Sequence, residues 1–109
     1  MRAPASAAAL AAVVVLAGCG GGTAAPRSHL HLNPVEKRGK TLFIRYCGSC
    51  HTLHDAGTQA LVGPDLDQPW EASRVRETIT DGPGEMPADL VTGRAAAAVA
   101  AYVAAASGG

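Results

Sequence analysis

Two cysteines and a histidine form the pattern with the most definite chemistry in this sequence. Cys47, Cys50 and His51 stand in the order C-x-x-C-H, which is the spacing of sites where haem is attached covalently. Two thiols three positions apart can add to the two vinyl groups of one porphyrin, and the adjacent imidazole then presents a nitrogen to the iron. The pattern therefore predicts one covalent haem c, with His51 as the proximal ligand of its iron.

Two other kinds of site share part of this pattern. A thiol–disulfide oxidoreductase has the same cysteine spacing, but it needs a strand–helix–strand context, and no segment here alternates as a strand does. A structural zinc site needs four ligands, and no second pair of ligands accompanies the first. We therefore favour haem over either alternative.

Met86 is the expected ligand on the opposite face of the haem. It lies in Asp81-Gly-Pro-Gly-Glu-Met-Pro87, a segment whose Gly and Pro residues favour tight turns. A lone methionine more often fills a core, but this one does not lie on an apolar helix face. The alternatives are His54, which follows His51 too closely to reach the other face and is expected at the surface, and an iron with an open position.

The third cysteine, Cys19, belongs to an export signal. Residues 1–18 contain Arg2 and then 11 apolar residues from Ala7 to Ala17, which is short of the roughly 20 that a membrane-spanning helix needs. Leu16-Ala-Gly-Cys19 resembles the lipobox of bacterial lipoproteins; the alternative is an ordinary signal peptide with a stray cysteine. We predict cleavage after residue 18, a lipid on Cys19, and a protein exported to the periplasm or anchored to the outer face of the cytoplasmic membrane.

Residues 19–33 have the Gly, Pro and polar composition of a flexible tether. A random coil of this length reaches on the order of 20 Å. His29 and His31 lie in this segment, and we expect solvated side chains there rather than metal ligands. The whole chain has 9 basic and 9 acidic residues, so it lacks the basic surplus that is typical of nucleic-acid-binding proteins.

Residues 34–107 are predicted to form one small all-α domain. Apolar residues at helical spacing, with Pro34, Gly82 and Thr92 as start and stop signals, indicate three helices at residues 35–46, 70–80 and 93–106. The residues expected on their buried faces are Val35, Gly39, Leu42, Phe43, Tyr46, Val75, Ile79, Val99, Tyr102, Val103 and Ala106. So few large side chains make a small core, and a flat apolar macrocycle would supply the missing buried surface.

The folded part resembles the class I bacterial c-type cytochromes. The resemblance rests on five segments: Gly39-Lys-Thr-Leu-Phe43, Cys47–His51, Gly63-Pro-Asp-Leu66, Met86-Pro87 and Ala101-Tyr102-Val103. In that family the N-terminal and C-terminal helices cross, and the resemblance places Gly39, Phe43 and Tyr102 at the crossing. It also places Pro64 on the proximal side, where its carbonyl accepts the N–H of His51. It implies a small three-helix cytochrome c fold wrapped around one haem.

The sequence departs from many of these relatives near the haem edge. Ala56 and Ala88 are small where relatives carry bulkier residues, so we expect a more exposed edge. Trp70 is expected either to contact a haem propionate or simply to fill the core.

Histidine and methionine ligands fill both axial positions of the iron and favour its ferrous state. We therefore expect an electron carrier rather than an enzyme, with no small-molecule substrate and with redox proteins of a membrane electron-transfer chain as partners. The alternatives are a haem c electron-entry subunit of a dehydrogenase or oxidase, a redox or gas sensor with a labile Met86, and a haem-free thiol-exchange lipoprotein.

Charged residues are unevenly placed along the folded part. The first predicted helix has four basic residues, Lys37, Arg38, Lys40 and Arg45. Three acidic residues flank Met86, namely Asp81, Glu85 and Asp89. This arrangement predicts either an acidic rim that meets a basic partner or a solvated loop.

Overall fold

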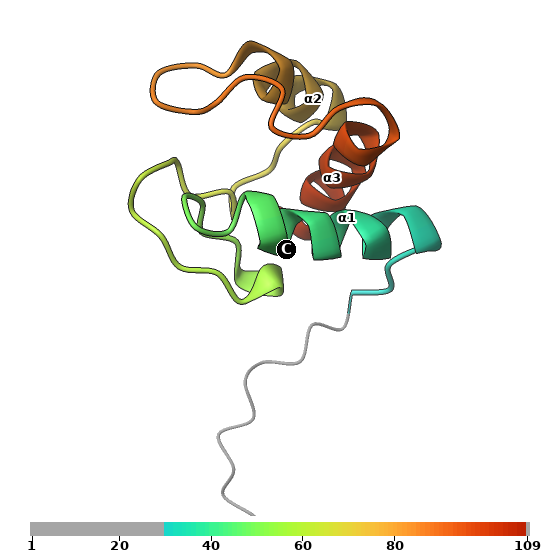
Figure 1. Cartoon of the computed structure of the whole chain (residues 1–109). Helices are drawn as coiled ribbons and strands as arrows, with labels where there is room; N and C mark the ends of the chain where they lie inside the picture. The colour runs from blue at the N-terminus through green and yellow to red at the C-terminus, as the bar shows by residue number, and fades with distance from the viewer. Residues whose placement is uncertain (1–29, 109) are drawn as a thin grey trace, which may run out of the picture.

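The computed structural model describes residues 30–108, in which three α-helices and one short 3₁₀ helix form the fold (Figure 1). In chain order these are α1 (Pro34–Tyr46), η1 (His54–Ala56), α2 (Ala72–Asp81) and α3 (Gly93–Ala106). Within this range the β-type pairing consists of an isolated bridge between Leu53 and Thr58, and no helix is long and apolar enough to cross a bilayer. The predicted all-α class with three helices is confirmed.

Some of the sequence predictions concern residues that lie outside this range. They are the signal peptide over residues 1–18, the lipidated Cys19, the tether up to residue 29, and His29. His31 is described, and its side chain is exposed, as expected for a solvated residue.

Helix α1 begins with a capping box at Asn33. The Asn33 side-chain oxygen accepts a hydrogen bond from the Glu36 N–H at 2.9 Å, and the Glu36 carboxylate accepts one from the Asn33 N–H at 2.9 Å. Pro34 then occupies the first turn, where a missing N–H costs nothing. The helix therefore starts one residue earlier than the predicted residue 35.

Helix α2 begins at Ala72, later than the predicted residue 70. The Trp70 N–H donates to the Ser107 hydroxyl at 3.0 Å, so Trp70 is tied to the end of α3 and does not join the helix. The expected stop is present, because Gly82 caps α2 with a left-handed φ of 56°.

Helix α3 has the predicted bounds. Thr92 stands at its N-cap, as predicted, but the Thr92 side chain makes no capping hydrogen bond. The Thr92 carbonyl instead accepts hydrogen bonds from the N–H groups of Ala95 at 3.1 Å and Ala96 at 3.2 Å.

The crossing of α1 and α3 forms the centre of the core, and α3 lies between α1 and α2 in Figure 1. A Cβ on Gly39 would overlap the Ala98 carbonyl oxygen and would lie 2.7 Å from Tyr102 Cβ, so the two helices can approach this closely only with glycine at position 39. One turn further on, the Phe43 and Tyr102 rings meet edge to face, with centroids 5.9 Å apart and an interplanar angle of 62°.

The buried stripe of α1 is narrower than predicted. Gly39 and Phe43 are buried, but Val35 is 54% exposed and Tyr46 is 37% exposed. Helix α1 packs mainly against one other helix, α3, and Val35 and Tyr46 at its ends are only partly covered.

Replacing Gly39 by alanine is expected to lower the free energy of unfolding by about 1–3 kcal/mol, the usual cost of overpacking, because the added methyl group meets backbone atoms. Chemical denaturation followed by far-UV circular dichroism measures the change. Thr41→Ala, at an exposed position of the same helix, is the control and should cost less than about 0.5 kcal/mol. Equal stability of the two variants would contradict a crossing that depends on Gly39.

A carboxylate that the sequence analysis overlooked lies beside this crossing. The Asp55 side chain is 7% exposed, and its Oδ2 accepts a hydrogen bond from the Tyr102 hydroxyl at 2.6 Å and lies 3.2 Å from Lys40 Nζ. These three residues belong to η1, α3 and α1. Burial, and then the hydrogen bond to Asp55, raise the pKa of Tyr102 far above its usual value of 10.0.

This raised pKa predicts how stability depends on pH. Above about pH 10 an unfolded Tyr102 loses its proton while the folded one keeps it, so the free energy of unfolding should fall as pH rises, by about 1.4 kcal/mol per pH unit at most. Tyr102→Phe should remove this fall and should cost about 1–3 kcal/mol at pH 7. Denaturation curves at pH 7 and above pH 10 measure both effects. Tyr46→Phe is the control, and the same flattening in both variants would contradict the assignment.

Candidate functional site

The C-x-x-C-H segment follows α1 directly and is folded into a tight turn. The Cys47 N–H caps the helix by donating to the Phe43 carbonyl at 2.8 Å, and the His51 N–H donates to the Cys47 carbonyl at 3.0 Å. A Cβ on Gly48 would lie 2.7 Å from Thr58 Cγ2, which explains glycine in the turn. Cys47 is buried, Cys50 is half-buried, and neither forms a disulfide.

The His51 ring is held in one orientation and one tautomer. Its Nδ1 lies 2.9 Å from the Pro64 carbonyl oxygen, and because a carbonyl can only accept, Nδ1 carries the proton. The lone pair of Nε2 is then available to a metal. The structure thus contains the contact that the family resemblance implied for Pro64.

A glycine packs against the face of the same imidazole. A Cβ on Gly63 would lie 2.5 Å from His51 Cε1 and 2.7 Å from Nδ1, and the Gly63 N–H donates to the Cys50 carbonyl at 2.7 Å. The backbone of His51 is also held, because the Thr58 hydroxyl donates to the His51 carbonyl at 2.9 Å. Sequence reasoning named neither Gly63 nor Thr58 as a support, and a short polar residue such as Thr58 gives no pattern that would reveal it.

The environment of Cys47 does not suit thiol exchange. Burial, and then the neighbouring Cys50, raise the pKa of the Cys47 thiol to about 11. A reactive cysteine of an oxidoreductase has a lowered pKa, because the thiolate is the attacking form. The geometry therefore disfavours the haem-free thiol-exchange alternative.

Met86 lies in a loop whose shape is fixed by its own backbone. The Met86 N–H donates a hydrogen bond to the Pro83 carbonyl at 3.1 Å, and the Asp89 N–H donates one to the Ile79 carbonyl of α2 at 2.9 Å. A Cβ on Gly82 would lie 2.7 Å from the Met86 carbonyl oxygen. The Met86 side chain is half-buried and packs against the core, so it is neither a surface residue nor a fully enclosed one.

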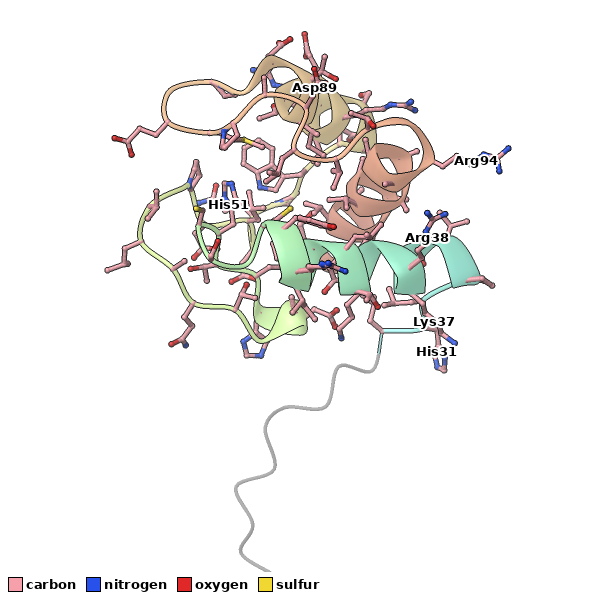
Figure 2. All side chains as sticks on the ribbon, in the orientation of Figure 1. His31, Lys37, Arg38, His51, Asp89 and Arg94 are labelled. Atoms are coloured by element: carbon pink, nitrogen blue, oxygen red, sulfur yellow. The ribbon has the colours of Figure 1, made fainter. Side chains whose placement is uncertain are left out.

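The two loops with the expected iron ligands lie on the same side of the helices. The connection from α1 to α2 contains His51 and the connection from α2 to α3 contains Met86. Both project to the left in Figure 1, beyond the C-terminal end of α1. Figure 2 shows His51 on that side, while Arg38 and Arg94 lie on the opposite one.

Trp70 contributes to the core, and its indole N–H has no partner in the described polypeptide. It is half-buried and packs against the core, yet its indole Nε1 is buried with no hydrogen-bond partner among residues 30–108. An unpaired buried donor costs about 1–3 kcal/mol, so it points to an acceptor that the polypeptide itself does not supply.

These observations test whether the chain fits a covalent haem, and it does. Cys47 and Cys50 would hold the porphyrin through thioether bonds, His51 and Met86 would bind the iron, and the Trp70 N–H would donate to a propionate. A second metal centre is not indicated, because residues 30–108 contain no group of three or more His, Cys, Asp or Glu side chains that could hold an ion. The His54 side chain is at the surface, as predicted.

Comparisons with known proteins agree with this site. A family model described as "Cytochrome C oxidase, cbb3-type, subunit III" matches residues 34–103. Among solved structures, the crystal structure of the c-type cytochrome SorU from Sinorhizobium meliloti matches with a TM-score of 0.61 and 38% identity, over 68% of this chain and 92% of that one. The search of curated proteins found no match.

Gly63→Ala is expected to disturb the imidazole, because the new methyl group cannot share space with the ring and must break the contact between Nδ1 and Pro64 or move the loop. We expect a shifted and broadened reduced visible spectrum and a loss of about 1–3 kcal/mol in the free energy of unfolding. Val62→Ala, at a neighbouring position that is 65% exposed, should leave both unchanged. A wild-type spectrum for Gly63→Ala would contradict this role.

Proposed function

Because the chain belongs to the c-type cytochromes, in the family of the cbb3-type cytochrome c oxidase subunit III domain, we propose that it is a membrane-tethered electron carrier with one haem that works outside the cytoplasm. Covalently bound haem c and electron transfer follow from the family itself. The observation that supports the finer assignment is the pairing of a tautomer-fixed His51 with Met86 in a loop of defined shape.

The carrier assignment depends on what the polypeptide does around the iron. Haem c supplies one-electron redox chemistry when bound. Pro64, Gly63 and Thr58 hold His51, and the loop around Gly82 holds Met86. His51 and Met86 would both bind the haem iron, and no position would then remain for a substrate, so we propose a carrier and not an enzyme.

Redox proteins are the proposed partners, and the acidic loop around Met86 is the proposed contact. Asp81, Glu85 and Asp89 are all exposed, and none of them forms a hydrogen bond or ion pair through its side chain within residues 30–108. Complementary charge accelerates encounter without making the complex permanent, as a carrier requires. Electron transfer to a basic partner should therefore slow as ionic strength rises.

Export and anchoring complete the proposal. The support is the sequence of residues 1–19, in which an apolar stretch ends at Leu16-Ala-Gly-Cys19. Cleavage there would leave a lipidated Cys19 as the N-terminus, and the folded domain would follow close behind it. Mass spectrometry of the membrane fraction tests the lipid directly.

A second candidate function is a permanent subunit of a terminal oxidase or a dehydrogenase. The observation in its favour is the description of the matching family as an oxidase subunit. Co-purification of a larger complex in mild detergent would favour this candidate over a mobile carrier.

The proposed function is tested first by the visible spectrum of wild type and Met86→Ala, matured in a host that assembles c-type haem. Wild type should show sharp reduced bands and the weak charge-transfer band of a methionine bound to ferric iron. Met86→Ala should lose that band, and its reduction potential should fall by on the order of 0.1 V or more, because the thioether favours ferrous iron. Glu85→Ala, next to it in the loop, should keep the band.

The other outcomes of this measurement separate the alternatives. A wild-type protein that lacks the band and readily binds carbon monoxide would be a sensor with an open or labile position. A protein that matures without haem would contradict the family-based assignment as a whole.

A further inference from the structure

A groove with two arginines lies between α1 and α3 on the side away from His51. It has a volume of about 210 Å³ and is lined by Val35, Arg38, Arg94, Ala97 and Ala98. Figure 2 shows Arg38 and Arg94 on this side of the molecule, with Lys37 and His31 below them and His51 on the opposite side. We call the surface formed by Val35, Arg38 and Arg94 the basic groove.

The cations of the basic groove are not neutralised by the domain. Arg38 and Arg94 form no ion pair or side-chain hydrogen bond with any of residues 30–108. The Glu36 carboxylate, the acidic residue nearest to Arg38 in sequence, accepts a hydrogen bond from the Asn33 N–H. Two unpaired guanidinium groups beside one groove favour an oxyanion, above all a phosphate group.

This positive surface stands out because the domain as a whole is acidic. Residues 30–108 contain seven basic and nine acidic side chains, and seven of the nine acidic ones fall between Asp65 and Asp89. Those seven belong to α2 and the connections on either side of it. Five of the seven basic residues belong to α1 and the start of α3, whereas Arg74 and Arg76 lie among the acidic residues of α2. The charge of the domain is therefore distributed unevenly, with its positive side at α1 and the start of α3.

Exposed apolar side chains accompany these cations. Val35, which lines the groove, is 54% exposed, and Leu30, next to His31, is 40% exposed. Apolar side chains among basic ones are typical of surfaces that settle into the headgroup region of a bilayer. A free phosphate ion or an acidic protein would not require them.

The position at which the chain enters the domain indicates that a lipid surface is the ligand of the basic groove. Ten residues lie between Cys19 and Leu30, and the eleven Cα-to-Cα steps from Cys19 to Leu30 can span no more than about 40 Å. The described part of the chain begins at Leu30, and the neighbouring His31 lies on the same side of the molecule as Arg38 in Figure 2. An anchor at Cys19 would therefore keep this groove within reach of the lipid surface at all times.

We infer that the basic groove docks on the anionic phospholipid headgroups of the membrane that holds Cys19. The inference rests on the anchor included in the proposed function and adds an orientation to it. With the groove on the bilayer, the side with His51 points away from the lipid and stays accessible to redox partners.

The test separates docking from anchoring. The mature chain from residue 19 onward, carrying Cys19→Ser and loaded with haem after export with an ordinary signal peptide, is sedimented with vesicles at low and physiological salt. The vesicles contain either phosphatidylcholine alone or phosphatidylcholine with phosphatidylglycerol. We expect binding to the anionic vesicles only.

The double variant Arg38→Gln/Arg94→Gln should weaken this binding on the order of 25-fold, because each basic residue near an anionic surface contributes about fivefold. The control Arg74→Gln/Arg76→Gln removes the same charge from exposed positions on α2 and should leave binding within about twofold. All variants should keep the wild-type reduced spectrum, which shows that the domain is intact.

Three results would overturn docking: no preference for anionic vesicles, an equal loss in the control variant, or full release by millimolar inorganic phosphate, which would indicate a site for the free ion. Binding to an acidic protein without any vesicle preference would overturn it as well. Mass spectrometry of wild-type Cys19 decides the anchor independently, so failure of the anchor and failure of the docking surface give different results.

Discussion

The close approach of α1 and α3 at Gly39 and Ala98 is the constraint on which the rest of the structure depends. Cys47 caps the end of α1, so the position of that helix sets where the C-x-x-C-H turn begins. At the other end, buried Val91 leads into α3 and closes the loop with Met86. The two ligand segments are thus placed by one contact between helices, although 35 positions separate His51 from Met86.

The two sides of the site are supported differently. On the His51 side, the Pro64 carbonyl, the Gly63 backbone and the Thr58 hydroxyl all contact His51. The Asp55 carboxylate also links the adjacent η1 to both crossing helices. On the Met86 side the support comes from turns within the loop and one hydrogen bond back to α2. The imidazole is therefore fixed from several directions, whereas the position of the thioether depends on the shape of one loop.

Sequence reasoning anticipated the parts of the structure that local patterns determine. The bounds of α3 and the stop at Gly82 follow from such patterns, whereas the contact of Gly39, Phe43 and Tyr102 was expected only from the family resemblance. The features it missed depend on partners far along the chain. Asp55 meets Tyr102 across 47 positions and Trp70 meets Ser107 across 37, and no periodicity encodes such pairs. The exposure of Val35 likewise depends on how far α3 extends along α1, which composition does not reveal.

The unpaired indole N–H of Trp70 lowers the stability of the folded polypeptide before haem is attached. A chain that folds without an acceptor for this donor bears a penalty of about 1–3 kcal/mol, a substantial part of the stability of a domain this small. A chain without haem therefore unfolds more often, and is exposed to proteases more often, than a chain with haem attached. A propionate that accepted this N–H would remove the penalty, so haem attachment would stabilise the folded chain at Trp70 as well as at the iron.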